Sequence, residues 1–487
     1  MKIRLNNVGI VSDSTMLLNG LTIITGKNNS GKTTVGKAVY SLLDAVSNLN
    51  SRANNDRERY IIDQLDDLVE TIEFLRFYVH TQELSSSEEL KDFALSFPAL
   101  HSLLSDEYKH DGPSNKLEDF ARLIKQELSK IKVEELYEIR PIQLFISHKS
   151  KTMMNRHDIL RVIAEKIDAA NTILIDLFSA LEKDPQLIEY ARESINQTLN
   201  VEFSGQIQPA SHSVANSKIE IYDNDVCCYN VNIENNRVVN NGEPVFYTTP
   251  YKKVFFIDNP FIFDDSSIYR RYLRYHAGIG SESLLNPSNI ISHNNKLKFI
   301  LKADSSTSVF EQTIINDSLD RIKREFDSIV PGAFEFSPSG DYYITNGTKL
   351  KISNLATGSK MFSIIKILLE KGHLGKSTML ILDEPEAHLH PSWQNKFAEM
   401  IVLLVKELGV NIVLTTHSSN FVLALDAYMR KHKVQEITNF YRTEFDENGM
   451  VDYVCVDDNI EDIYQDFLQY LSEVKMLRNK YLKNCGE

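Results

Sequence analysis

The sequence predicts an α/β fold in which a parallel or mixed sheet is flanked by helices and carries a large helical insertion. Three observations lead to this prediction. An apolar strand, a glycine-rich loop and a helix follow one another between residues 21 and 43. Apolar residues recur at helical spacing between residues 45 and 200. Between residues 360 and 430, helices alternate with short apolar strands, a pattern typical of a parallel sheet.

The composition is that of a globular protein. Of 487 residues, 42% are apolar and 25% are charged, and this length suggests roughly two to four structural units. The net charge of −14 argues against a broadly nucleic-acid-binding surface but not against a local basic groove. The polar start MKIRLNNVGI and the lack of a long apolar run argue against a signal peptide and a membrane span. The four cysteines lack metal-site spacing, so reduced thiols and a cytoplasmic location are expected.

The first candidate site is the loop GKNNSGKTT, which follows the apolar run LTIIT and opens a helix. It fits the pattern G-x-x-x-x-G-K-[ST], in which backbone N–H groups and a helix N-terminus surround an anion. Lys32 can reach the outer phosphates of a nucleotide, and Thr33 can offer its hydroxyl to magnesium. A chance glycine turn is the alternative, and it does not account for the complete pattern. Nucleotide contacts are expected from Gly26, Asn28, Asn29, Ser30, Gly31, Lys32, Thr33 and Thr34.

Residues 46–200 are predicted to form a helical insertion. Within it, an a/d seam of about three heptads consists of Ile61, Leu65, Leu68, Ile72, Leu75 and Val79. Two more amphipathic helices are predicted at Leu117–Ile131 and Leu160–Leu181. A compact insertion with its own core is preferred to a long protruding coiled coil, which would need more unbroken heptads.

The remaining segments alternate between strand-like and helical patterns. Lys2–Ile10 is predicted as a strand, and so are the runs VEFSGQIQP, KIEIYD, DVCCYNVNIE and VFFIDNP after residue 200. Helices are expected at Ile268–Arg274 and Val309–Val330, strands within Phe334–Ser353, a hairpin at Glu436–Val456 and a helix at Ile460–Leu482. The predicted parts of the chain are 1–45, 46–200, 201–265, 266–352, 353–435 and 436–487.

An acidic pair ends the apolar strand TMLIL. The carboxyl end of a parallel strand is where such a sheet places its ligands. Asp383 is expected to hold magnesium, directly or through water, and Glu384 to polarise a water that attacks the terminal phosphate. Two solvated acids at a strand end are the alternative, which the upstream loop makes the weaker one.

Three of the histidines that follow the acidic pair are candidates for a role. The strand NIVLT runs into Thr416-His417-Ser418, and His417 is expected to hydrogen-bond the terminal phosphate and report its presence. His388 and His390 stand two residues apart in a loop, which is weak support for a metal site without further ligands. A role in loop structure or subunit contact is preferred for these two.

A stretch of small residues, SNLATGSK, opens the helix MFSIIKILLE. Small residues and a glycine at a helix N-terminus make an anion site. If this site faced the nucleotide of a second copy of the chain, that nucleotide would be sandwiched between subunits.

With these four segments in this order, the chain resembles the ABC/SMC-type ATPases of the AAA-related P-loop group, over about residues 1–45 and 350–425. Within that group it is most similar to the OLD-type branch, whose acidic segment runs into a sequence like DEPEAHLHP. The resemblance implies an ABC-type head that uses ATP and Mg2+, with Thr33 and Asp383 at the metal. It also implies that Lys32, Glu384 and His417 act as phosphate-binding lysine, hydrolytic base and switch histidine.

The same resemblance implies a signature segment that contacts the partner's ATP. Its predicted ligands are Leu355, Thr357, Gly358 and Ser359. Ala356 stands where the family usually has serine, and Thr357 stands where it has glycine, which puts rapid hydrolysis in doubt more than binding. The closest counterpart of the family's glutamine loop is the end of VFFIDNP, where Asp258 and Asn259 stand.

In size and branch the chain is similar to the ATPase subunits of bacterial anti-phage systems of the PtuA type (Septu and retron-linked) and the AriA type (PARIS). About seventy residues follow Ser418, too few for the Toprim domain of OLD and Gabija nucleases, so a nuclease is expected on another chain. The expected partners are further copies of this chain, joined through an ATP sandwich into a dimer or larger oligomer, and a separate effector. Nucleic acid is left as a further partner of that complex, and no membrane is expected.

Three alternatives stay open at this point. An SMC-like ATPase of DNA repair or chromosome maintenance would need long coiled coils or a DNA-binding surface. A nucleotide-gated scaffold would bind ATP tightly and barely hydrolyse it, which Ala356 motivates. A transporter ATPase is the least favoured, because such subunits usually lack a helical insertion of this length.

Overall fold

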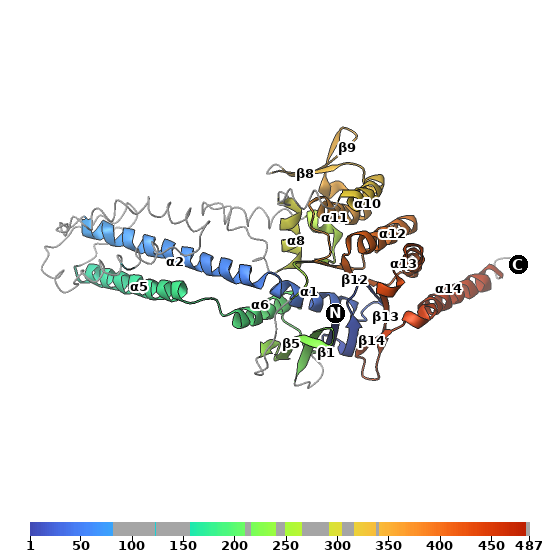
Figure 1. Cartoon of the computed structure of the whole chain (residues 1–487), viewed down its shortest axis with the longest axis horizontal. Coiled ribbons are helices and arrows are strands. Elements are labelled where there is room, and N and C mark those ends of the chain that lie inside the picture. Colours follow the sequence, from blue (N-terminus) through green and yellow to red (C-terminus); the bar gives the residue numbers. More distant parts are fainter. Residues whose placement is uncertain are drawn as a thin grey trace. The chain divides into compact units, whose positions relative to one another are not determined.

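The computed structural model describes residues 1–80, 122, 156–209, 216–239, 249–264, 292–303, 316–337 and 340–483. The chain divides into two compact units, residues 1–49 with 187–487, and residues 50–186. Figure 1 labels their helices and strands. The predicted helices at Leu117–Ile131 and Ile268–Arg274 lie outside the described residues, residue 122 excepted.

The first unit is built on a mixed sheet. Among the described residues it has eleven strands, in the order β6-β5-β4-β1-β2-β14-β13-β3-β12-β11-β7. The neighbours from β13 to β7 are parallel, whereas the pairs β1–β2, β1–β4, β4–β5 and β5–β6 are antiparallel. The predicted α/β class, a mixed sheet flanked by helices, is therefore confirmed. The strands are β1 (Lys2–Val8), β2 (Val11–Leu17), β3 (Leu21–Thr25), β4 (Ser217–Asp223), β5 (Val226–Glu234), β6 (Arg237–Val239), β7 (Lys253–Ile257), β11 (Thr378–Asp383), β12 (Asn411–Thr416), β13 (Thr438–Phe445) and β14 (Val451–Cys455).

Side chains of the central strands alternate between two hydrophobic cores. In β11, Leu380 and Leu382 belong to one core, and Met379 and Ile381 belong to the other. Because successive side chains of a strand point to opposite faces, the two cores lie on the two faces of the sheet. Both faces are covered, which explains why the central strands are apolar throughout.

The helices of this unit divide between the two cores. Helices α1 and α6 contribute to the core that contains Met379, and α8, α10, α11, α12 and α13 contribute to the core that contains Leu380. Their bounds are α1 (Lys32–Val46), α6 (Leu187–Glu202), α8 (His293–Lys302), α10 (Asn316–Ile329), α11 (Thr357–Glu370), α12 (Pro391–Leu408), α13 (Ser419–His432) and α14 (Ile460–Lys483). A second, small antiparallel sheet consists of β8 (Ala333–Ser337), β9 (Gly340–Thr345) and β10 (Thr348–Lys351).

Local sequence accounts for where α12 begins and ends. His390 is its N-cap, and the ring Nδ1 accepts a hydrogen bond from the Ser392 N–H. Pro391 occupies the first turn, where its fixed φ suits the helix and its missing N–H costs nothing. Gly409 ends the helix in the left-handed region, at φ 67°. His390 thus has the structural role in its loop that the sequence favoured over a metal site.

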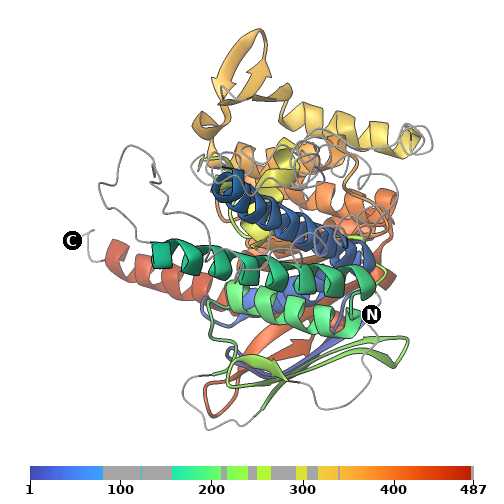
Figure 2. The ribbon, with the colours of Figure 1, turned by 90° about the vertical axis from the view of Figure 1, so that its left-hand side faces the viewer.

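The second unit contains two long helices, α2 (Leu49–His80) and α5 (Arg156–Glu182). Arg57, near the start of α2, donates 2.8 Å hydrogen bonds to the carbonyls of Ala180 and Leu181 at the end of α5, so the helices run antiparallel. Figure 1 and Figure 2 show them side by side. From the predicted seam of α2, Ile61 and Leu68 are fully buried. The buried residues of α5 recur at the same 3-4-3 spacing: Ile167, Ala170, Leu174 and Leu177.

One strand prediction after residue 200 was wrong. The run VEFSGQIQP is not a strand, because α6 continues through Glu202 and is followed by turns. The strand predicted at Lys2–Ile10 is confirmed as β1 (Lys2–Val8), and the turn into β2 follows it. Asn7 and Gly9 turn the chain there at φ 54° and 58°, a conformation that asparagine and glycine tolerate.

The predicted C-terminal hairpin exists as β13 and β14, and the helix after it exists as α14. The hairpin does not form a separate part of the chain. Instead, β13 pairs in parallel with β3, and β14 pairs with β2, so both strands complete the main sheet. The C-terminal segment therefore lies directly beside the strand that leads into the glycine-rich loop.

The aromatic core above the sheet makes a stability prediction. The ring of Phe362 is fully buried and meets those of Trp393 and Phe397 edge-on, at centroid distances of 5.4 and 4.9 Å. Phe362→Ala is expected to lower the free energy of unfolding by about 3–5 kcal/mol. Urea denaturation followed through the chain's single tryptophan, Trp393, measures it. Phe445→Ala, at a ring that is 53% exposed, should change it by less than about 0.5 kcal/mol. An equal decrease in the free energy of unfolding of the two variants would contradict the burial of Phe362 in this core.

Candidate functional site

The parallel strands bring the predicted site residues to one edge of the sheet. The register pairs Thr25 of β3 with Thr416 of β12, and Thr415 of β12 with Asp383 of β11. The carboxyl ends of these strands therefore lie side by side, which is where an open α/β sheet binds its ligands. The glycine-rich loop, the acidic pair and His417 all leave the sheet at this edge.

The glycine-rich loop wraps around the side chain of Lys32. The ammonium donates hydrogen bonds to the carbonyls of Gly26, at 3.1 Å, and Lys27, at 2.7 Å. Asn29 and Gly31 have φ values of 61° and 71°, which bend the loop tightly before α1 begins at Lys32. The Thr34 N–H donates to the carbonyl of the N-cap Gly31 at 2.9 Å, and the N–H groups that open a helix are suited to binding an anion. The predicted strand, loop and helix are present.

Asp383 joins three elements of the site. Its carboxylate accepts a 2.7 Å hydrogen bond from the hydroxyl of Thr33 in α1, and the hydroxyl of Thr415 in β12 donates to the other oxygen. Burial raises the pKa of Asp383, and the neighbouring carboxylates of Glu384 and Asp258 act in the same direction. A hydroxyl and a carboxylate oxygen held this close suit Mg2+, which binds hard oxygen ligands, and its charge would offset the buried negative charge.

Glu384 lies between Lys32 and His417. Its two carboxylate oxygens are 3.5 Å from Lys32 Nζ and 3.2 Å from His417 Nδ1. Its backbone is in the left-handed region, at φ 46°, where its N–H donates to the carbonyl and the hydroxyl of Thr415, each at 3.1 Å. Such a conformation costs energy for a residue with a side chain and is often found at functional sites. The structure therefore brings the three predicted catalytic residues into one cluster.

Glu386 and Gln394 extend this cluster, and no role was predicted for either residue. Glu386 is almost completely buried and accepts a hydrogen bond from the Thr416 hydroxyl, while burial raises its pKa. The Gln394 amide donates to the Leu389 carbonyl at 3.2 Å and accepts from the Ser418 hydroxyl at 3.1 Å. These bonds connect the loop after the acidic pair to the end of β12. Glu386 belongs to the run DEPEAHLHP, but its role could not be predicted because its partner, Thr416, lies thirty residues away in the sequence.

The β13–β14 hairpin holds the glycine-rich loop from the other side. The hydroxyl of Thr443 donates to that of Ser30 at 2.8 Å, and the hydroxyl of Tyr453 donates to the Gly31 carbonyl at 2.7 Å. A Cβ on Gly26 would lie 1.8 Å from the Thr443 hydroxyl, so this close approach requires glycine. The loop contacts were not predicted, because no local pattern in the sequence marks Thr443 or Tyr453.

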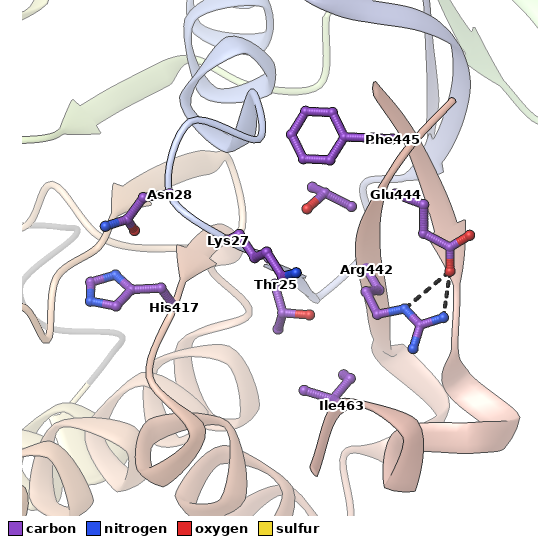
Figure 3. Close-up of a pocket in the computed structure, with 10 residues that line it drawn as sticks. Thr25, Lys27, Asn28, His417, Arg442, Glu444, Phe445 and Ile463 are labelled. Carbon is purple, nitrogen blue, oxygen red and sulfur yellow. Dashed lines mark hydrogen bonds and ion pairs between the residues drawn. The ribbon is translucent and has the colours of Figure 1, made fainter. Parts of the chain in front are cut away.

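A cavity of about 590 Å³ opens beside the loop. Figure 3 shows Asn28 and His417 on one side of it and Arg442, Glu444 and Phe445 of β13 on the other. Arg442 forms an ion pair with Glu444. The lining residues are Thr25, Gly26, Lys27, Asn28, His417, Arg442, Thr443, Glu444, Phe445 and Ile463.

The small-residue segment lies at the start of α11, against the loop that follows the acidic pair. A Cβ on Gly358 would be 2.9 Å from the Leu389 side chain and 3.4 Å from the His388 carbonyl. Ala356 is the N-cap of α11 and makes no side-chain capping bond. Buried Lys360 anchors the helix by an ion pair of 2.7 Å with Asp264. The segment is thus coupled to the loop after the acidic pair.

Asp258 and Asn259, the predicted counterpart of a glutamine loop, follow β7 at the same sheet edge. Asp258 is 3.2 Å from His293 Nε2, and His293 Nδ1 is 2.5 Å from Glu202. Burial opposes the charge of His293, but the two carboxylates outweigh it and raise its pKa to about 9. Asn259 caps the short helix Pro260–Phe263 by accepting from the Phe261 N–H at 2.8 Å.

Two absences hold for the part of the chain that the structure describes. No group of three or more histidine, cysteine, aspartate or glutamate side chains is arranged to hold a metal ion. Within the same residues, no helix combines the length and apolar character needed to cross a membrane.

Comparisons with known proteins give one similarity over a short segment and several over most of the chain at low identity. A segment of 103 residues is 30% identical to the Old nuclease of Escherichia phage P2 and covers 21% of this chain and 16% of that protein. Solved SMC heads match at low identity. The head bound to the C-winged helix domain of ScpA is 12% identical, with 93% of this chain and 96% of that chain covered and a TM-score of 0.36. The Thermotoga maritima SMC head is 12% identical, with 93% and 98% covered and a TM-score of 0.33.

A family model covers most of the chain. It is described as "AAA domain, putative AbiEii toxin, Type IV TA system" and matches residues 21–424. The matched region begins at β3 and ends in α13, so it contains the glycine-rich loop, the acidic pair and His417. The chain therefore belongs to this AAA family of P-loop ATPase domains.

Proposed function

We propose that the chain binds and hydrolyses ATP with Mg2+ at the edge where β3, β11 and β12 end, and that it does so as an ABC-type assembly of several copies. The observation that carries the proposal is the cluster of Lys32, Glu384 and His417 around the glycine-rich loop. The residues in it come from three strand ends, and their chemistry suits phosphoryl transfer to water.

The loop and Lys32 bind the phosphates in this proposal. The backbone N–H groups of Asn28, Asn29, Ser30 and Gly31 and the start of α1, including Thr34, surround the anion. Lys32 exchanges its bonds to loop carbonyls for bonds to phosphate oxygens. Thr33 and Asp383 would hold Mg2+, which, when bound, neutralises phosphate charge.

Glu384 takes the proton of the attacking water, and His417 holds the terminal phosphate. In the structure, one carboxylate oxygen of Glu384 is near Lys32 and the other is near His417. Phosphate oxygens would replace the carboxylate as the partners of both cations. Glu384 would then be free to accept a hydrogen bond from water beside the phosphate, where a general base acts.

The signature segment completes the site of a second copy. Its predicted ligands are Leu355, Thr357, Gly358 and Ser359. The packing of Gly358 against Leu389 and His388 supports this, because that loop follows the acidic pair directly. A change at one nucleotide would thus reach the surface that meets the neighbouring copy. Because Ala356 provides no capping hydroxyl, the Thr357 hydroxyl is the proposed contact in trans.

The assembly is proposed to regulate or scaffold a separate effector, a nuclease, in defence against phages. The partial similarity to the Old nuclease of Escherichia phage P2 supports this direction. Nucleic acid would reach the assembly through that effector. A nucleotide-gated scaffold with slow turnover is the second candidate, and the missing hydroxyl at Ala356 favours it.

Glu384→Gln tests the base and the composite site together. The amide keeps the shape of the side chain but cannot take a proton, so hydrolysis should fall by roughly 10²–10⁴-fold, while ATP binding persists.

Light scattering of Glu384→Gln should then show a larger mass when ATP and Mg2+ are added. Adding Thr357→Val to Glu384→Gln should reduce this increase in mass. Glu447→Gln, the same change at an exposed turn residue, is the control. If Glu384→Gln stays monomeric at saturating ATP, the composite site is contradicted.

Thr33 tests the magnesium site. Thr33→Ala removes a proposed metal ligand and should raise the Mg2+ concentration needed for half-maximal ATP binding by about tenfold or more. Thr33→Ser keeps the hydroxyl and should remain close to the unchanged protein. The measurement is a magnesium titration of fluorescent ATP-analogue binding. If Ala and Ser behave alike, the Thr33 hydroxyl is not a ligand.

The defence role is tested by plating phages on cells that carry the chain with its adjacent genes. Protection should depend on Lys32, so that Lys32→Ala lowers it by orders of magnitude at equal protein level. Lys475→Ala, at an exposed lysine of α14, controls for the loss of one positive charge. Unchanged plating with and without the genes, over a broad phage panel, would remove the defence role but leave the ATPase proposal standing.

A further inference from the structure

The C-terminal helix α14 carries one apolar seam along its whole length. Its spacing alternates between three and four residues, which is the a/d pattern of a helix that packs along one partner helix. The seam residues are Ile460, Ile463, Phe467, Tyr470, Val474, Leu477 and Tyr481. Counted from Ile460 as position a, Val474 and Tyr481 are a residues and Leu477 is a d residue.

The two ends of this seam have opposite surroundings. Ile460 and Ile463 belong to the core of the first unit and are 9% and 2% exposed. Val474, Leu477 and Tyr481 are 63%, 55% and 63% exposed. Figure 1 shows α14, in red, leading away from α13 and β14 toward the C-terminus. The same apolar face is therefore covered by its own unit at the start and uncovered at the end.

We propose that the outer half of α14 pairs with α14 of a second copy in a parallel, two-stranded coiled coil. A β-branched residue at a and leucine at d favour two parallel strands, and Val474 and Leu477 have this arrangement. The pairing would bury the exposed seam against the identical seam of the other copy, as a two-fold axis requires.

The flanking charges fit the same arrangement. Glu473 is a g residue and Arg478 is the following e residue, five positions later. In a parallel pair, g of one helix lies beside the following e of the other, so Glu473 meets Arg478 of the second copy, and symmetry forms this pair twice. An antiparallel pair places g beside g and e beside e and does not bring opposite charges together in this way.

This contact is separate from the signature segment and does not require nucleotide. Two heptads make a weak pair by themselves, because short helices in water are marginal. A nucleotide sandwich in the same assembly would raise the effective concentration of the two helices. Because the two contacts use different surfaces, an assembly that forms both can grow beyond a dimer.

Cysteine cross-linking tests the pairing in the full-length protein. Leu477→Cys places a thiol at a d position, where the two copies of a parallel pair meet, and Asn479→Cys places one at the exposed outer f position. Under mild oxidation without nucleotide, Leu477→Cys should give a disulfide-linked dimer well above both Asn479→Cys and the unchanged protein, whose native cysteines set the background. Equal yields from the two cysteine variants would overturn the proposal.

A charge exchange tests the register. In the Leu477→Cys background, Glu473→Arg should lower the dimer yield roughly three- to tenfold, and adding Arg478→Glu should restore it. A loss that the second change does not restore would overturn the parallel self-pairing and leave α14 to a different partner. Because all three residues are exposed, their substitution spares the core. A failed cross-link together with an ATP-dependent mass increase in Glu384→Gln would separate this inference from the proposed function.

Discussion

The site depends on one partly buried carboxylate. Asp383 at the end of β11 accepts hydrogen bonds from Thr33 at the start of α1 and from Thr415 at the end of β12. A buried carboxylate is costly unless its oxygens are satisfied, so these bonds favour one mutual position of the three elements. Once that position is set, Glu384 follows directly in the chain and lies between Lys32 and His417.

The glycine-rich loop is held from two sides. On one side, Glu384 and Asp383 contact Lys32 and Thr33. On the other side, Thr443 and Tyr453 of the C-terminal hairpin bond to the loop itself. The hairpin is covalently followed by α14, and Ile463 of that helix lines the cavity beside the loop. The nucleotide loop and the start of the proposed pairing helix therefore border the same cavity.

The two proposed surfaces for further copies of the chain are built on this arrangement. The signature segment packs on the loop after the acidic pair, and the first turn of α14 joins the core that also contains Phe440 of β13. Pairing through two distinct surfaces allows a closed ring or a larger assembly, whereas a single two-fold contact stops at a dimer. In such an assembly, nucleotide state could be passed from copy to copy by rigid elements, and the covered cores on both faces of the sheet provide that rigidity.

The sequence by itself determined the α/β class, the glycine-rich loop, the acidic pair and the position of His417. These features depend on contiguous patterns: a strand of apolar residues, then the polar residues that follow its carboxyl end. Only the tertiary structure decided that Tyr453 bonds to Gly31, 422 residues away, that Thr443 bonds to Ser30, and that Glu386 is buried under Thr416. It also placed β13 and β14 in the main sheet and ended α6 at Glu202, where a strand was predicted. The physical reason is that strand pairing and side-chain burial depend on partners distant in the chain, whereas a phosphate-binding loop carries most of its chemistry in its own backbone.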